Sequence, residues 1–162
     1  MSDDLYDRDI LVWSQQQADL LRRMARGERV NHVDWENLVE EIEDVGRSVL
    51  YAVQSYLRLI IVHALKLHAW PDSDSCRHWH EEIAAFQADA RQRFAPSMRQ
   101  KIDLDLLYRD AVRQVGKSGQ TAPSPRQFAQ SNPFALDELL NADSDDLLHR
   151  LEAAPAVPDP PA

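Results

Sequence analysis

Residues 34–72, DWENLVEEIEDVGRSVLYAVQSYLRLIIVHALKLHAWPD, decide the fold of this 162-residue chain. Apolar side chains recur along this stretch at three- and four-residue steps, the spacing of one face of an α-helix. The stripe consists of Leu38, Ile42, Val45, Val49, Val53, Tyr56, Ile60, Ala64 and Leu67. Asp34 is a good N-cap residue, and Trp70-Pro71-Asp72 ends the pattern. The stretch therefore predicts one long helix.

The predicted helix changes character along its length. Up to Gly46 it is amphipathic, with acidic residues on the outer side. From Leu57 onward it is apolar almost all round, because Ile61, Val62 and Leu65 lie outside the main stripe. Such a helix must be covered on every side, either by the rest of a bundle or by another subunit. Gly46 costs about 1 kcal/mol relative to alanine, so a kink or a close helix crossing is expected there.

Shorter helices are predicted on both sides of this stretch. A first helix over residues 7–26 carries Trp13 and Gln17 on its apolar face, and Gly27 ends it. Later helices are expected over 76–94, 104–116, 133–140 and 145–151, with a polar loop over 117–125. The sequence thus predicts an all-α, up-down bundle of about four main helices with short C-terminal helices, as one domain over residues 1–153. Residues 154–162, with four prolines, should be disordered.

Composition narrows the set of partners. The chain has 27 acidic and 18 basic residues, a formal net charge of −9, so phosphate backbones and anionic membrane surfaces should repel it. A single cysteine, Cys76, excludes an intramolecular disulfide and fits a reducing compartment. No secretory signal opens the sequence. We therefore expect a cytoplasmic protein that binds neither nucleic acid nor membrane.

Three motifs stand in a fixed order. Residues 6–22 read YDxDxxxWxxxQxxLLR, residues 34–46 read DxxNLxEEIExxG, and residues 57–66 read LRxxxxHxLK. In content and spacing these motifs resemble the bacterial family known only as domain of unknown function 29, over roughly the first 115 residues. The resemblance implies a helical bundle of prokaryotic origin. It implies no activity, cofactor or catalytic residue.

Glu41 is the first candidate for chemistry. At 100° per residue it lies at the edge of the apolar stripe, while Glu40 and Glu43 point outward, so it should be partly buried. One interpretation is a carboxylate at the rim of the core, paired with an arginine. The other is a metal ligand or an acid–base group facing a bundle cavity.

His63 is the second candidate, because it lies in the middle of the apolar stripe. A histidine in a core needs hydrogen-bond partners. We therefore predict that His63 is buried and bonded to side chains of another helix, with Gln17 as the natural partner. A metal-binding or catalytic role is the alternative.

Four more residues gather around the turn after the long helix: His68, Cys76, His78 and His80. Imidazole and thiolate groups suit zinc or nickel. The spacing matches no established zinc pattern. His78 and His80 would lie 200° apart around a helix axis, so both cannot face one ion. No cofactor is therefore predicted, and a divalent metal held by His63, Glu41 and this group is kept as an alternative.

Two functions follow. The leading one is a non-enzymatic helical protein that acts through protein–protein contacts, as a homo-oligomer or with a partner chain; a small acidic regulator such as an antitoxin is one form of it. The alternative is a metal-dependent helical-bundle enzyme that uses His63, Glu41 and the neighbouring histidines and cysteine. Triad signatures, P-loops and dinucleotide-binding glycine patterns are absent from the sequence.

Overall fold

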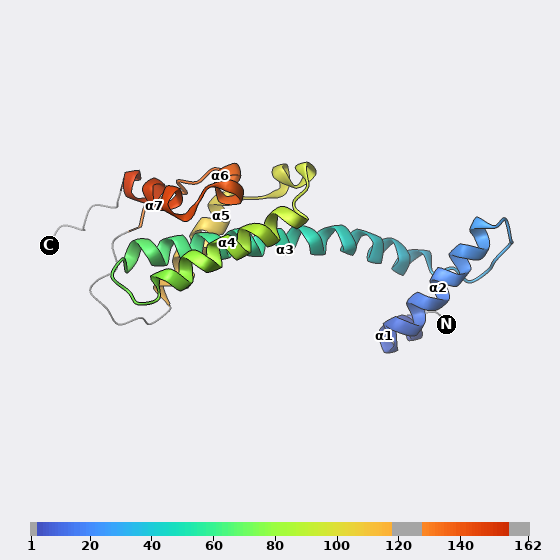
Figure 1. The fold of residues 1–162 in the computed structure, drawn as a ribbon. Helices are drawn as coiled ribbons and strands as arrows, with labels where there is room; N and C mark the ends of the chain where they lie inside the picture. Colours follow the sequence, from blue (N-terminus) through green and yellow to red (C-terminus); the bar gives the residue numbers. More distant parts are fainter. Residues whose placement is uncertain (1–2, 118–127, 156–162) are drawn as a thin grey trace. The chain divides into compact units, whose positions relative to one another are not determined.

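A computed structural model describes residues 3–117 and 128–155 of the chain (Figure 1). The elements in order are α1 (Asp3–Arg8), α2 (Ile10–Ala25), α3 (Trp35–Ala69), α4 (Cys76–Arg93), a 3₁₀ helix (Pro96–Lys101), α5 (Leu104–Gly116), α6 (Leu136–Asn141) and α7 (Ser144–Ala153). No β-strand occurs within those two ranges. The all-α prediction is confirmed.

The chain divides into two compact units, residues 1–48 and residues 49–162, and α3 contributes to both. Each unit is described by itself. The expectation of one domain over residues 1–153 stays a prediction. The predicted disordered tail and most of the predicted loop over 117–125 lie outside the described residues.

The first unit contains α1, α2 and the beginning of α3. The prediction of a single helix over residues 7–26 is wrong, because Asp9 separates two helices, α1 and α2. The Asp9 carboxylate accepts a hydrogen bond from the Val12 backbone N–H at 3.0 Å and so caps the start of α2. Gly27 follows the end of α2 with a φ of 83°, the left-handed conformation expected of a terminating glycine.

Helix α3 begins and ends where the sequence predicts. Asp34 Oδ1 accepts from the Asn37 backbone N–H at 3.4 Å, which is an N-cap contact. The last backbone bond runs from Trp70 N–H to the Lys66 carbonyl, just before Pro71. The 35-residue helix continues through Gly46.

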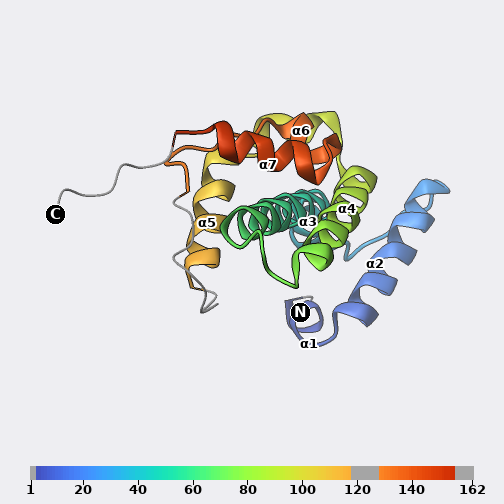
Figure 2. The ribbon, with the colours of Figure 1, turned by 60° about the vertical axis from the view of Figure 1, so that its left-hand side comes forward.

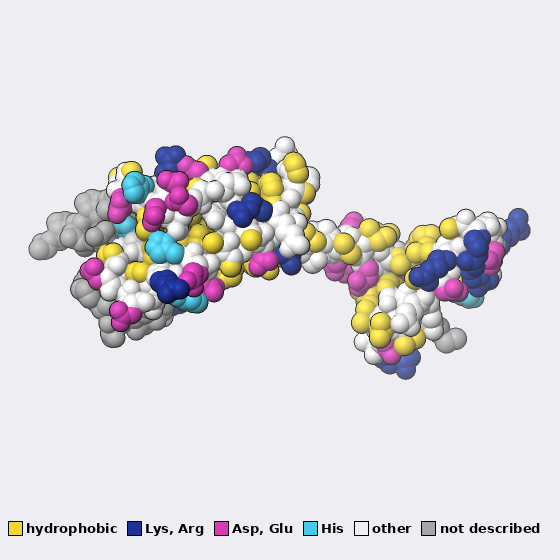
Figure 3. Space-filling view, viewed as in Figure 1, with side chains coloured by type: hydrophobic (Ala, Val, Ile, Leu, Met, Phe, Trp, Pro, Cys, Tyr) yellow, Lys and Arg dark blue, Asp and Glu magenta, His cyan; other side chains and the backbone are white. Residues whose placement is uncertain are grey.

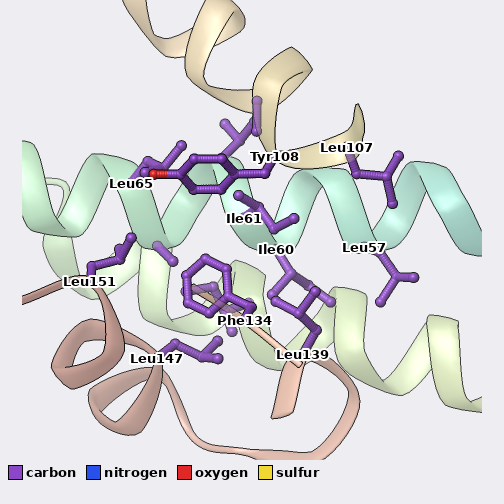
Figure 4. Packing of buried hydrophobic residues seen from close by; sticks show 14 of the residues in the cluster. Leu57, Ile60, Ile61, Leu65, Leu107, Tyr108, Phe134, Leu139, Leu147 and Leu151 are labelled. Atoms are coloured by element: carbon purple, nitrogen blue, oxygen red, sulfur yellow. The ribbon is translucent and has the colours of Figure 1, made fainter. Parts of the chain in front are cut away.

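In the second unit, the part of α3 from residue 49 onward is the central element. Figure 2 shows α4, α5 and the α6–α7 pair surrounding it, with α5 running across α3. Leu57, Ile61, Val62 and Leu65 are fully buried among these helices. Figure 4 shows the packing of α3 against Tyr108 of α5, Phe134 and the leucines of α6 and α7. Of the two explanations for the all-round apolar section, coverage by the chain's own helices is therefore correct.

Side chains of α4 hold the C-terminal helices in place. The Gln87 amide donates to the carbonyls of Leu139 at 3.0 Å and Ala142 at 2.7 Å, and Arg91 donates to the Leu140 carbonyl at 2.6 Å. The last carbonyls of a helix have no partner inside that helix. These two α4 residues supply the missing donors for α6, so the short helix is fixed by tertiary contacts.

Within the described residues, α3 has the length and the apolar composition of a helix that could cross a membrane. In the most apolar 18-residue stretch of α3, 44% of the residues are buried inside the protein. The core helix of a soluble protein can have the same length and composition. The expectation that the protein binds no membrane stays a prediction.

Candidate interaction surface

A buried polar network fixes the start of α3 within the first unit. The Trp13 indole N–H donates to Asp34 Oδ2 at 3.0 Å, and the Asn37 amide donates to the same oxygen at 2.8 Å. The Asp34 backbone N–H in turn donates to the Gln17 side-chain oxygen at 2.9 Å. The hydrogen bonds from Asn37 and from Trp13 hold the pKa of the Asp34 carboxyl below its usual range. Four residues of the sequence motifs thus serve to position one helix terminus.

Glu41 forms another side-chain hydrogen bond that holds α3 within the first unit. It is half-buried, as predicted, and its Oε1 accepts from the Tyr6 hydroxyl at 2.7 Å. This hydrogen bond raises the pKa of Tyr6 to about 12. The prediction that Glu41 pairs with an arginine is wrong, because its partner is the Tyr6 hydroxyl. Glu41 instead connects α1 to α3, while the Tyr6 ring packs edge-on against Trp13 at 4.9 Å.

The neighbouring face of α3 is apolar and open to solvent. The exposed fractions are 55% for Trp35, 54% for Val39, 68% for Ile42 and 66% for Val45. Figure 3 shows hydrophobic side chains along this length of α3, next to acidic ones. On α2 of the same unit, Ile10, Leu11 and Val12 are also exposed. Contiguous apolar surface of this kind marks interaction sites in soluble proteins. We call Trp35, Val39, Ile42 and Val45 the open face.

The open face corrects one prediction. Ile42 and Val45 were expected in a buried stripe, yet both are solvent-exposed. In the first unit, α1 and α2 contact α3 through Tyr6, Trp13 and the polar network at its start. Those contacts do not reach Ile42 or Val45, so the stripe stays open there.

A charged edge runs beside the open face. Arg47 pairs with Glu43 at 3.2 Å and also with Asp44. Gly46 lies on the open face itself, one helical turn after Ile42, and no described atom comes within 4 Å of the place where a Cβ would stand. The position therefore has room for a side chain.

His63 lies in the core of the second unit, as predicted, with 9% of its surface exposed. Its Nδ1–H donates to the Leu59 carbonyl of the same helix at 2.8 Å, and its ring centre lies 5.5 Å from that of Phe86. The predicted side-chain partner on another helix is wrong, and Gln17 is used by Asp34 in the first unit. Burial lowers the pKa of His63, which favours the neutral ring.

The other candidate ligands have separate surroundings. His68 is buried against Phe128, with ring centres 6.3 Å apart, whereas His78 is exposed. The Cys76 thiol donates to the Trp70 carbonyl at 3.2 Å, an ordinary packing contact. Among the described residues, no group of three His, Cys, Asp or Glu side chains could hold a metal ion. The residues of the metal hypothesis are thus not brought together.

His80 contributes a different contact. Its Nδ1 lies 2.6 Å from the Ser144 hydroxyl, which joins α4 to the start of α7. A serine nucleophile needs a histidine that is itself oriented by a further group. Within the described part of the chain, His80 shows no second hydrogen-bond partner. The pair therefore acts as a link between helices.

A cavity of about 600 Å³ lies beside α6 and α7. Its lining includes Glu138 and Arg150, which form an ion pair with each other. Both charges are thus engaged within the protein.

Comparisons with known proteins give a family and one solved structure. The family described as "Domain of unknown function DUF29" matches residues 5–144. The crystal structure of an alpha-helical protein of unknown function from Rhodospirillum rubrum ATCC 11170 is 29% identical and has a TM-score of 0.71. The match covers 93% of this chain and 98% of that chain. No curated protein matches.

The exposed apolar surface of α3 is not in the part of the helix where the sequence suggested it. Residues 57–65, where an interface was one expectation, are covered by the chain's own helices, and Ile42 and Val45, expected in the core, are exposed. A signal was present in the spacing of Trp35, Val39, Ile42, Gly46 and Val49, which alternates four and three residues. That is the spacing of a helix seam that pairs with a second helix.

Proposed function

This chain belongs to the family described as Domain of unknown function DUF29, and because that description carries no activity, we propose from the geometry that the protein is non-enzymatic and acts through protein–protein contacts. The observation that carries the proposal is the open face of α3, with four large apolar side chains more than half exposed. The proposal includes a cytoplasmic location, in keeping with the net charge of −9 and the single cysteine.

Energetics favour a partner at this place. Burying an apolar side chain contributes roughly 25 cal/mol per Å² removed from water. The open face is also rigid, because Asp34 and Glu41 fix this part of α3 to α2 and α1. A preorganised surface loses little conformational entropy on binding. The first unit thus offers both a driving force and a fixed shape.

The recognition mode would be that of one helix laid against another. The open face follows residues 35, 39 and 42 along a single helix, the pattern of helix-in-groove and coiled-coil contacts. Charged side chains beside it, Glu43 and Arg47, would form the polar rim that surrounds such contacts.

Site-specific photo-crosslinking in the native cell tests the proposal. A benzoyl-phenylalanine at position 42 should give a cross-linked protein species of one discrete mass, which an added Val45→Asp substitution removes. The control places the same group at position 106, since Leu106 is an exposed apolar residue on α5 in the second unit. Absence of a species at position 42, or equal yields at 42 and 106, would refute the proposal.

A further inference from the structure

A second hollow in the protein lies between α3 and α5, which cross each other in the second unit (Figure 2). Its volume is about 510 Å³, a size at which pockets hold small molecules. The lining consists of Arg58 from α3 and of Asp110, Arg113, Gln114 and Lys117 from α5 and its end. Three of these side chains are cations and one is a carboxylate, whereas the whole chain has a net charge of −9. We call this positive site on an acidic protein the basic hollow.

Arg58 is the unusual member of the basic hollow. It is half-buried and belongs to the section of α3 in which Leu57 and Ile60 are fully buried. Its guanidinium donates to the side-chain oxygen of Gln114. Within the described ranges, its polar contact is thus with a neutral amide and not with a carboxylate. A half-buried cation of this kind has lost part of its hydration, and a bound anion would compensate for that loss.

The two bases on α5 have a simpler explanation, which does not extend to Arg58. Arg113 lies in the last turn of α5 and Lys117 is its C-cap residue, and cations at the end of a helix offset the helix dipole. Arg113 also pairs with Asp110 at 3.3 Å. Arg58, in contrast, lies in the interior of α3, far from either end of that helix. Dipole compensation therefore does not explain why a third cation lines the same hollow.

Gln114 adds hydrogen-bond donors to this charge. Because its side-chain oxygen accepts from Arg58, its amide nitrogen keeps two N–H donors for another partner. A guanidinium has five N–H donors, and the bond to Gln114 uses one of those of Arg58. The basic hollow therefore offers a planar guanidinium, a neutral N–H donor and the ammonium group of Lys117. This combination suits an oxyanion.

We propose that the basic hollow binds the phosphate group of a small phosphorylated molecule. A phosphate monoester has a charge of about −1.5 to −2 at pH 7, which balances three cations and one carboxylate better than the single charge of a carboxylate ligand does. Arg58 binds two phosphate oxygens with its planar fork, Gln114 donates to another, and Lys117 supplies charge. Nucleic acid and anionic membranes are disfavoured, because the net charge of −9 repels the many further charges of such partners.

The phosphate site and the proposed function can fail separately. The basic hollow belongs to the second unit, whereas the open face belongs to the first. A ligand in the hollow contacts α3 and α5 together, so it should stabilise the folded second unit by mass action. Its binding is measured without the cross-link from position 42, and neither result decides the other.

Nuclear magnetic resonance of the ¹⁵N-labelled full chain tests the site, with glycerol phosphate as the probe at constant ionic strength. The side-chain amide signals of Gln114 should shift and saturate at millimolar concentration. Sulfate should compete for the site, and acetate should not, because acetate carries a single charge. Affinity for glycerol phosphate should fall about fourfold from pH 7.5 to pH 5.5, since the second pKa of the phosphate is about 6. Unchanged Gln114 signals, or equal binding of acetate, would overturn the phosphate site.

A matched pair of variants tests the role of Arg58. Arg58→Gln should weaken binding of glycerol phosphate about tenfold or more, and Arg58→Lys should weaken it less, because lysine keeps the charge but lacks the planar fork. The control is Arg77→Gln, which makes the same change of charge at an exposed residue of α4 in the same unit and should leave the affinity unchanged. Equal losses in Arg58→Gln and Arg77→Gln would refute a specific site.

Two further measurements keep the test decisive. If Arg58→Gln does not fold, as judged by circular dichroism, Lys117→Gln at the exposed end of α5 takes its place, and an unchanged affinity in that variant counts against the site. A phosphoserine peptide is then compared with glycerol phosphate. Similar affinities support recognition of the phosphate of a small molecule, whereas a peptide that binds at least about tenfold more tightly would overturn the small molecule in favour of a phosphorylated protein.

Discussion

In the first half of α3, Ile42 has 68% of its surface exposed, whereas in the second half Ile60 is fully buried. Both residues belong to one apolar stripe on one continuous helix. The second half is covered by α4, α5, α6 and α7, while hydrogen bonds to α1 and α2 hold the first half near its start. One continuous apolar stripe can therefore lie in a core in one segment and at a free surface in the next.

The largest expected difference is between two identical substitutions in the two halves. Ile60→Ala should lower the free energy of unfolding by about 2–5 kcal/mol, because it leaves a cavity in the core. Ile42→Ala, at low protein concentration, should change it by no more than about 0.5 kcal/mol. Urea titration followed by circular dichroism measures both. Similar costs at the two positions would mean that the first half is covered after all.

Polar contacts, rather than apolar packing, should hold the uncovered half. Trp13→Phe removes the indole N–H that donates to the buried Asp34 carboxylate, and a hydrogen bond to a charged group contributes about 1.5–3 kcal/mol. Trp35→Phe is the matched control, since Trp35 is more than half exposed. Thermal unfolding should distinguish the two variants. An equal loss in both would contradict the role given to the network.

The covered half contains one titratable group whose protonation opposes folding. Burial lowers the pKa of His63 below the unfolded value of about 6.5, so the unfolded chain binds the proton more readily. The stabilisation from the neutral ring is thus present above about pH 6.5 and is lost as the pH falls toward the lower folded pKa.

Replacing His63 by Gln should flatten the stability curve below about pH 6.5. The comparison is His149→Gln, an exposed residue on α7, which should leave the curve as in the wild type. Urea midpoints across the pH series measure the effect. A wild-type curve that stays flat in this range would rule out the burial effect on His63.

The smallest expected change is at Gly46, close to the junction of the two halves. Under conditions where the chain is monomeric, Gly46→Ala should raise the free energy of unfolding by up to about 1 kcal/mol, because alanine is the better helix former and the site has room for a Cβ. Chemical denaturation at low protein concentration gives the value. A loss of stability would show that α3 needs glycine for its own backbone.

Much of the fold was predictable from local signals. Asp34 and Trp70-Pro71 mark the bounds of α3, and Gly27 ends α2, because caps and terminators act within a few residues of the helix end. The break at Asp9 was not predicted, since the apolar pattern continues on both sides of it. Burial of His63 followed from its place in the stripe, but its bond to the Leu59 carbonyl did not.

The candidate site was less predictable than the fold. The position of Glu41 at the boundary of the stripe was predicted correctly. Its partner, Tyr6, lies on another helix, so the spacing of residues along α3 could not identify it. The histidines and Cys76 are close in sequence but have separate surroundings in the structure. Proximity along a chain limits distance only loosely, because side chains one or two positions apart on a helix point in different directions.

The sequence by itself determined the helices, their caps, the acidic charge and the existence of a long apolar stripe on α3, since each of these depends on residues within a few turns of one another. Only the tertiary structure decided which part of that stripe is covered. Coverage depends on whether other helices reach it, and that follows from long-range contacts such as those of Gln87 with α6 and of Trp13 with Asp34. The main apolar stripe runs through both halves of α3, and the neighbours of each half make its part of the stripe a core or a surface.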